Sequence, residues 1–408
     1  MSLIVQKYGG KSVADADRIR NVAARIARGR DEGNKMVVVV SAMGDTTDKL
    51  ISLAHQLVER PAERELDVLM STGEIVSSTL LAMTLEGMGY GAVSLTGFQA
   101  GIHTDSRYSK ALITSIDPQR IRDELKRGNA VVVAGFQGVT PDLDTTTLGR
   151  GGSDTTAVAL AVSLGASVCE IYTDVEGVYT ADPRIVPHAV KLKAISYEEM
   201  LELATYGAAV MAPRAVELGQ VYNMPIRVAS SMSGATGTLI CREDLMELRN
   251  KVSGIAHDTN VAKIMVIGVA DHPGTAGDIF EPLARANISV DTIVQNAGTN
   301  SVTDVTFTVA RTDVMKALSI IEPVARTIGA QKVTSDSTLA KVSIVGTGMQ
   351  NAPGYAARMF RALADANINI QLITTSEIRI TCIIHEAQVK NAVMVLHKAF
   401  EVEFRQPE

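Results

Sequence analysis

The chain has 408 residues, of which 46% are hydrophobic and 21% charged, a composition typical of a globular protein with two to three domains. Its net charge of -6 argues against a nucleic-acid-binding surface, and the apolar run that Lys7 interrupts is too short for a signal peptide. We expect no membrane span, and we expect Cys169, Cys241 and Cys382, which lack metal-ligand spacing, to be core residues of a cytoplasmic protein.

Up to about residue 240, short apolar runs alternate with amphipathic helical patterns, which predicts a mainly parallel sheet covered by helices. Residues 12–29 place their apolar positions on one helical face, and another helix is predicted to begin where Ser196 and Glu199 stand at capping-box spacing. The predicted strands are residues 2–8, 35–42, 130–136, 168–174 and 225–230.

Glycine and charge gather directly after three of these strands, in "KYGGK", "SAMGDTTDK" and "TDVEGVYTADPR". Open α/β sheets bind ligands beyond the carboxyl ends of their strands, so we expect these loops to form one site. Lys7 beside two glycines would bring a cation and bare N–H groups to a phosphate, although the stretch is neither a P-loop nor a dinucleotide fingerprint. Tyr179 could stack on a nucleotide whose phosphate meets Arg184, while Asp182-Pro183 is equally an ordinary turn.

The stretch "GRGGSDTTAVALA" sets Arg150 and Asp154 either side of two glycines and a serine, before an apolar helix. Bare N–H groups at a helix start and an arginine favour an anion, whereas Asp154 would repel one. A ligand that carries both signs of charge removes this conflict. Glu74, in "STGEIVSS", is predicted near the start of a helix, where an exposed glutamate would merely complement the helix dipole.

The second half contains an internal repeat. Residues 273–293 and 353–373 align without gaps at an offset of 80 residues, with ten of 21 positions identical. Each copy reads strand, Pro-Gly loop, helix, strand, strand, and continues towards a further helix and strand. The alternatives are a plain packing module and a pair of small-ligand sensor domains, in which the Pro-Gly turn receives a ligand carboxylate at a helix N-terminus.

The motifs "KYGGKSV", "SAMGDTTD", "STGE", "GRGGSDTTA" and "TDVEGVYTADPRIVP" resemble those of the amino acid kinase family. With the repeat and "TSEIRI", the resemblance runs nearly end to end and is to the aspartate kinase branch, which carries two ACT domains. It implies an α/β fold in which a mainly parallel sheet sandwiched by helices precedes two ferredoxin-like βαββαβ domains. The implied domains are a catalytic domain at 1–245, a first ACT domain at 263–335 and a second at 246–262 plus 336–408.

The resemblance implies transfer of the ATP γ-phosphate to the β-carboxylate of L-aspartate, with Mg²⁺ held by the ATP phosphates and by no protein side chain. Lys7 and Asp154 would be the catalytic residues. Aspartate would contact Thr47, Glu74, Arg150, Gly151, Gly152, Ser153 and Asp154. ATP would contact Lys7, Tyr8, Gly9, Gly10, Ser41, Thr173, Asp174, Tyr179, Asp182 and Arg184.

The ACT half implies inhibition by lysine, threonine or both, in a homo-oligomer assembled through the ACT domains, with or without a separate ACT-only subunit. Effector contacts carried over by position are Asp278, Asp291, Gln295, Asn351, Ala352, Pro353 and Gly354. Tyr8 and Lys11 depart from the family's KFGGTS, and Lys11 adds a cation that puts nucleotide affinity in doubt. A non-catalytic amino-acid sensor and a kinase for another amino acid therefore stay open as alternatives.

Overall fold

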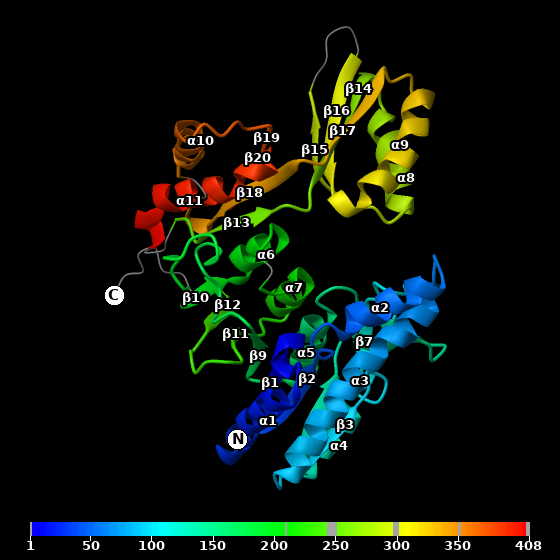
Figure 1. Cartoon of the computed structure of the whole chain (residues 1–408), viewed down its shortest axis with the longest axis vertical. Coiled ribbons are helices and arrows are strands. Elements are labelled where there is room, and N and C mark those ends of the chain that lie inside the picture. The colour runs from blue at the N-terminus through cyan, green and yellow to red at the C-terminus, as the bar shows by residue number, and fades with distance from the viewer. Residues whose placement is uncertain (1, 209, 243–250, 297–301, 350–351, 405–408) are drawn as a thin grey trace. The chain divides into compact units, whose positions relative to one another are not determined.

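The computed structural model describes residues 2–208, 210–242, 251–296, 302–349 and 352–404. By their internal contacts these residues form two compact units, each with its own cores (Figure 1). The first unit comprises residues 1–179, 191–205 and 209–247, and the second comprises residues 180–190, 206–208 and 248–408.

The first unit is built on an eight-stranded sheet in the order β10-β12-β11-β9-β1-β2-β6-β3. The strands from β11 to β3 run parallel, and β12 is antiparallel to β11. The five strands expected from the apolar runs are confirmed as β1, β2, β6, β9 and β11. The bounds are β1 (Leu3–Tyr8), β2 (Lys35–Val40), β3 (Ala92–Leu95), β6 (Ala130–Ala134), β9 (Val168–Thr173), β10 (Ala194–Ser196), β11 (Ile226–Ser230) and β12 (Thr238–Cys241).

Helices cover both faces of this sheet: α1 and α3 contact each other on one face, and α5 and α7 on the other. The predicted capping box is confirmed, because the Glu199 N–H donates to Ser196 Oγ at 3.2 Å where α6 begins. The helices are α1 (Ala16–Asp31), α2 (Thr46–Leu57), α3 (Glu63–Gly87), α4 (Gln119–Lys126), α5 (Gly152–Leu164), α6 (Tyr197–Thr205) and α7 (Pro213–Val221), with the 3-10 turn η1 (Gly10–Val13).

A small sheet in the order β5-β4-β7-β8 supports the segment that leads into α5. Asp67 of α3 is fully buried and accepts bonds from the N–H groups of Ser109 and Thr147, both at 2.8 Å. It thereby fixes the end of β8 just before the Gly149–Asp154 turn. The strands are β4 (Ile102–Thr104), β5 (Ile113–Ile116), β7 (Gln137–Val139) and β8 (Thr145–Thr147).

The second unit contains the two copies of the repeat, each with a four-stranded antiparallel sheet and two helices. The sheet orders are β15-β16-β14-β17 and β19-β20-β18-β13, so β13 takes in one copy the edge place that β17 takes in the other. The first copy has β14 (Ala262–Ala270), α8 (Thr275–Arg285), β15 (Val290–Gln295), β16 (Val302–Val309), η2 (Arg311–Asp313), α9 (Val314–Thr327) and β17 (Lys332–Asp336). The second has β13 (Gly254–Asp258), β18 (Leu339–Val345), η3 (Thr347–Met349), α10 (Tyr355–Asp365), β19 (Leu372–Thr375), β20 (Arg379–His385), η4 (Glu386–Gln388), α11 (Val389–Ala399) and η5 (Glu401–Phe404).

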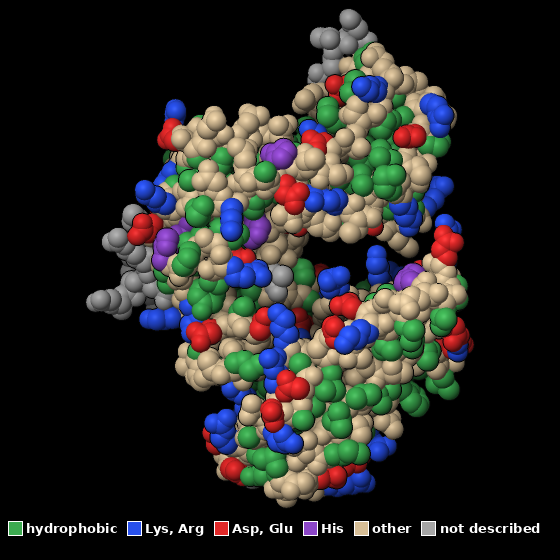
Figure 2. Space-filling view, in the orientation of Figure 1, with side chains coloured by type: hydrophobic (Ala, Val, Ile, Leu, Met, Phe, Trp, Pro, Cys, Tyr) green, Lys and Arg blue, Asp and Glu red, His purple; other side chains and the backbone are tan. Residues whose placement is uncertain are grey.

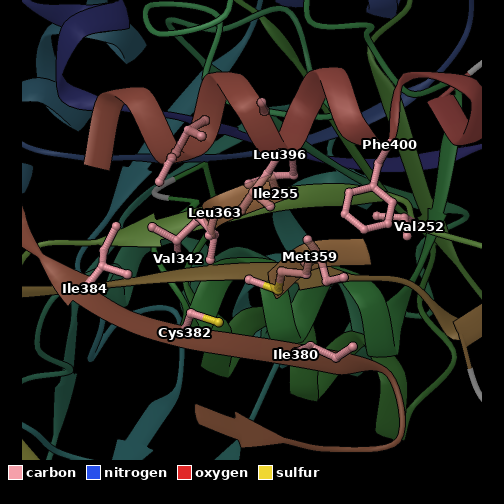
Figure 3. Packing of buried hydrophobic residues seen from close by; sticks show 14 of the residues in the cluster. Val252, Ile255, Val342, Met359, Leu363, Ile380, Cys382, Ile384, Leu396 and Phe400 are labelled. Atoms are coloured by element: carbon pink, nitrogen blue, oxygen red, sulfur yellow. The ribbon is translucent and has the colours of Figure 1, made fainter. Parts of the chain in front are cut away.

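Each copy packs its two helices on one face of its sheet, over a separate apolar core. In the second copy Met359, Leu363 and Leu396 lie over strand residues that include Val342 and Cys382 (Figure 3). Burial raises the pKa of the Cys382 thiol to about 12, as expected for a core cysteine. Cys169 is also buried, whereas Cys241 is partly exposed, so the expectation of three core cysteines holds for two of them.

The helix that bears on the expectation of no membrane span is α3. Within the described part of the chain, α3 has the length and mean hydropathy to cross a membrane, and half of its most apolar window is buried. On its outer side Val76, Leu80 and Met83 are 51%, 39% and 60% exposed, and apolar side chains gather over this part of the surface (Figure 2). A core helix of a folded domain passes the same test, so the finding is weak evidence for a membrane.

Candidate active site

The site is organised around an ion pair between β1 and the first turn of α5. Side chains alternate along a strand, so Tyr8 packs into the core under α1 and α3 while Lys7 points to the opposite face. There the Lys7 ammonium lies 2.7 Å from Asp154 Oδ1, and the two side chains are only 12% and 10% exposed. The structure therefore brings together two predicted residues that stand 147 positions apart in the sequence.

Glycines allow the loops at the carboxyl ends of β1 and β2 to approach each other closely. A Cβ on Gly10 would lie 2.7 Å from the Ala42 carbonyl oxygen, and the Gly44 N–H donates to the Gly10 carbonyl at 3.0 Å. The Ser41 N–H donates to the Tyr8 carbonyl, also at 3.0 Å. The two predicted glycine-rich loops are thus neighbours, and Gly10 has a steric reason to lack a side chain.

Glu74 lies in the middle of α3, not near a helix start, so that prediction is wrong. Its residue is 3% exposed, and its Oε1 accepts a bond from the Ala42 N–H at 3.0 Å. Gly73 permits this contact, because a Cβ there would lie 2.7 Å from the Ala42 Cβ. Gly73 therefore lets the helix approach the loop, whereas by sequence it suggested a boundary.

Burial raises the pKa of Glu74 to about 7 from 4.5, although the Ala42 N–H and the Lys7 charge both act to lower it. The unfolded chain releases this proton at lower pH than the folded protein, so the contribution of Glu74 to stability is full below pH 4.5 and is lost as pH rises through 7. We expect Glu74→Gln to remove this loss. Between pH 4.5 and 8, the free energy of unfolding measured in urea should fall by about 3 kcal/mol more for wild type than for Glu74→Gln. Parallel stability curves for the two proteins would show that Glu74 ionises normally.

The turn before α5 depends on Gly151. Gly151 has a φ of 74°, in the left-handed region, and its Cβ would lie 2.4 Å from the Ala212 Cβ. The Ala212 N–H in turn donates to Asp154 Oδ2 at 3.2 Å. Arg150, one residue earlier, is exposed, whereas Ser153 and Asp154 are buried. The turn thus places a cation at the surface beside a buried carboxylate and a helix N-terminus.

Tyr8 and Lys11, the two departures from the family motif, differ in exposure. Tyr8 is fully buried, with its ring stacked on Tyr172 at 4.9 Å and its hydroxyl donating to Gln6, so it is not open to a ligand here. Lys11 is exposed, and its ammonium lies 2.7 Å from Asp174 Oδ2. This pair joins the loop after β1 to the loop after β9, and it lowers the pKa of Asp174. Lys11 is therefore a bridge between two predicted ATP loops.

The predicted ATP segment 173–184 is divided between the two units. Thr173, Asp174 and Tyr179 belong to the first, where the Thr173 hydroxyl donates to Asp174 Oδ1 at 3.1 Å. Asp182 and Arg184 belong to the second, where their side chains pair at 2.8 Å. The first unit alone therefore gathers the residues after β1, β2 and β9, together with Thr47 in the first turn of α2.

The predicted effector positions fall in both repeats, with Asp278, Asp291 and Gln295 in the first and residues 351–354 in the second. Gly274 and Gly354 both cap a helix with a positive φ, at 106° and 104°, and Asp278 stands in the first turn of α8. Gln295 ends β15, Ala352 and Pro353 precede α10, and Asn351 lies outside the described residues. The Asp291 carboxylate already accepts a bond from the Tyr206 hydroxyl at 3.2 Å and pairs with Lys341, so it is less available to an effector ammonium than expected.

Sequence reasoning missed several residues that position this site. Asp67 fixes the strand before the Gly149–Asp154 turn, and Ala212 supplies a main-chain N–H to Asp154. Ser231, after β11, accepts a bond from the Ser12 hydroxyl at 2.7 Å and donates its N–H to the Thr173 carbonyl. A polar residue inside α3 was a usable signal for Asp67, but no local pattern marks a main-chain donor such as Ala212.

Comparisons with known proteins agree with this architecture. Residues 2–230 match the amino acid kinase family, and residues 264–323 and 342–400 match the ACT domain. The aspartokinase of Pseudomonas aeruginosa is 51% identical over 405 residues, covering 99% of this chain and 98% of the relative.

Two solved structures of Escherichia coli aspartokinase III share the fold at 26% identity. The R-state complex with aspartate and ADP has a TM-score of 0.82 and covers 97% of this chain and 99% of that one. The T-state complex with lysine and aspartate has a TM-score of 0.73, with coverages of 98% and 99%. The α/β fold and the ACT domains expected from the motifs are confirmed, and the chain belongs to the amino acid kinase family, within its branch of ACT-containing aspartokinases.

Proposed function

We propose that the chain transfers the γ-phosphate of ATP to the β-carboxylate of L-aspartate, giving 4-phospho-L-aspartate and ADP. The observation that carries the proposal is the buried Lys7–Asp154 pair at 2.7 Å, where glycine loops meet at the carboxyl ends of β1 and β2. Lysine ammonium and bare N–H groups suit phosphate, and the turn with Arg150, Asp154 and nearby Glu74 suits a zwitterion with a second carboxylate. Relatives named aspartokinase, about 50% identical over the whole chain, support the same substrate.

Aspartate would be held by opposite charges at its two ends. Arg150 would bind the α-carboxylate with help from Thr47, while the carboxylates of Glu74 and Asp154 would face the α-ammonium. Ser153 would orient the side chain, and Gly151 and Gly152 would leave room for close approach of the substrate. An ammonium beside Glu74 would favour its ionised form, so substrate binding would lower the raised pKa of this residue.

The chemical step requires positioning more than proton transfer. The β-carboxylate of aspartate has an ordinary pKa of about 3.9, so it is ionised at neutral pH and needs no general base. Lys7 and the Gly10 N–H would hold the β- and γ-phosphates and stabilise charge in the transition state, whereas the Gly9 N–H already donates to the Tyr172 carbonyl at 3.2 Å. The Ala212 N–H would hold Asp154, and Asp154 would hold the Lys7 ammonium.

Mg²⁺ would enter this site with the nucleotide. The oxygens of the ATP phosphates would supply its ligands. When bound, the ion neutralises charge on the transferred phosphate and its leaving group. Ser41, Thr173, Asp174 and Tyr179 of the first unit would complete the ATP contacts, whereas Asp182 and Arg184 belong to the second unit.

Regulation would come from the two ACT domains. We propose that lysine, threonine or both bind near the Pro-Gly turns of α8 and α10, where positive-φ glycines open onto helix N-termini. Contacts would come from Asp278, Gln295 and the 351–354 loop, with Asp291 available only after its pairing with Lys341 is broken. Such inhibition requires the effector to bind one conformation of the oligomer more tightly than another.

The proposal is tested by trapping the acyl phosphate. With ATP, Mg²⁺ and hydroxylamine, we expect aspartate to give a hydroxamate and glutamate to give far less at equal concentration. If glutamate gave a hydroxamate and aspartate gave none, the protein would be a kinase for another amino acid. No hydroxamate from any acid, with lysine or threonine still bound in calorimetry, would establish a sensor without catalysis.

A further inference from the structure

The segment between α6 and α7 is anchored at its two ends in different units. Tyr206 and Gly207 belong to the second unit, and Ala212 belongs to the first. Only four residues of sequence separate Gly207 from Ala212. Five Cα–Cα steps span at most about 19 Å, so a large displacement of one end must displace the other.

The first anchor is a nearly closed cluster around the Tyr206 ring, which is 9% exposed. The Arg379 guanidinium lies 3.9 Å from the ring centre and the Lys341 ammonium 5.6 Å from it. The Tyr206 hydroxyl donates to Asp291, and Asp291 pairs with Lys341. Lys341 and Arg379 are only 6% and 7% exposed, so these charges are partly desolvated and the contacts are stronger than at an open surface.

This cluster joins the two ACT repeats. Asp291 comes from β15 of the first repeat, whereas Lys341 and Arg379 come from β18 and β20 of the second. Tyr206 therefore makes contacts that depend on how the repeats are placed against each other. Beside it, Gly207 has a φ of 119°, and a Cβ there would lie 1.7 Å from the His257 carbonyl oxygen. The chain is thus held against β13 as well.

The second anchor is in the active site. The Ala212 N–H donates to Asp154 Oδ2 at 3.2 Å, and the other oxygen of Asp154 holds Lys7. Ala212 also packs where a Gly151 side chain would be, 2.4 Å from that Cβ position. A shift of Ala212 would therefore reorient Asp154, the Lys7 ammonium and the Gly151 turn together.

We propose that residues 206–212 are the covalent link by which the ACT repeats set the geometry of Asp154. When the repeats rearrange, Tyr206 loses or regains its contacts with Asp291 and Arg379, and the Ala212 N–H moves on or off the carboxylate. Tyr206 is thus a positioning residue that acts through Ala212. The expected effect on catalysis rests on the proposed function, whereas the movement of Ala212 does not.

The test compares Tyr206→Ala and Tyr206→Phe with Tyr355→Ala in the full-length protein. Tyr355 is a suitable control because it is a partly buried aromatic of the same unit, stacked on Phe400 at 6.2 Å and remote in sequence from the link. We expect Tyr206→Ala to speed hydrogen exchange of the Ala212 amide by about tenfold or more. Tyr206→Phe, which keeps the ring over Arg379, should have a smaller effect, and Tyr355→Ala none at Ala212.

Kinetics supply the second measurement. Tyr206→Ala should raise the KM for aspartate about fivefold or more, while Tyr355→Ala leaves this KM unchanged. Unchanged exchange at Ala212 in Tyr206→Ala, or an equal change in Tyr355→Ala, would overturn the link. If wild type forms no hydroxamate, the proposed function fails, and the exchange comparison still decides whether the link exists.

Discussion

Replacing Lys7 with alanine is expected to lower kcat by about two to three powers of ten while the KM for aspartate changes little. The reason is that the ammonium would stabilise phosphate charge that develops in the transition state, whereas aspartate would be bound by other groups. Lys11→Ala is the matched control, because Lys11 is a lysine four residues away that is exposed and pairs with Asp174. We expect that variant to keep kcat within a few-fold of wild type. Steady-state kinetics with saturating ATP measure both.

Loss of Lys7 also leaves Asp154 without its partner, which could reduce activity through misfolding alone. Urea unfolding of Lys7→Ala separates the two causes. If misfolding were responsible, kcat would be low only under conditions in which part of the variant is unfolded. We expect kcat to be low also under conditions in which the unfolding curve shows the variant fully folded. Wild-type turnover in Lys7→Ala would remove this lysine from the mechanism.

Replacing Arg150 with alanine is expected to raise the KM for aspartate by about 10- to 150-fold, the equivalent of about 1.5 to 3 kcal/mol for a charge-assisted contact. The effect should fall on aspartate and spare the KM for ATP. Arg150→Lys should recover only part of the loss, because an ammonium cannot bind a carboxylate through two parallel hydrogen bonds.

Arg20→Ala is the control for this prediction, since Arg20 is an exposed arginine on α1 that pairs with Asp17 three residues earlier. Its KM values should equal those of wild type, because exposed pairs of this kind contribute little. If Arg150→Ala instead raised the KM for ATP and left that for aspartate unchanged, the arginine would be reassigned to phosphate binding. If Arg150→Ala changed neither KM, the role of Arg150 would be structural only.

Local patterns predicted most of the fold because each depends on neighbours along the chain. Apolar runs located β1, β2, β6, β9 and β11 to within two residues. The repeat predicted the order of elements in the first ACT copy, but in the described part of the second copy no strand follows α11 and β13 takes the edge place. Glu74 was misjudged because glycine usually marks a boundary, while Gly73 continues α3 and admits the Ala42 loop. The hydropathy of α3 likewise reflects burial on one side and an apolar outer face on the other.

The sequence by itself determined the family, the parallel sheet, the tandem repeats and the loops that carry charge and glycine, because these are written in periodicity and in short motifs. Only the tertiary structure decided that Lys7 meets Asp154, that Lys11 meets Asp174 and that Tyr8 is closed off in the core. It also decided that Tyr206 is held by Asp291 and Arg379. The physical reason is that such contacts join residues up to 173 positions apart, and packing, which no local pattern records, selects them.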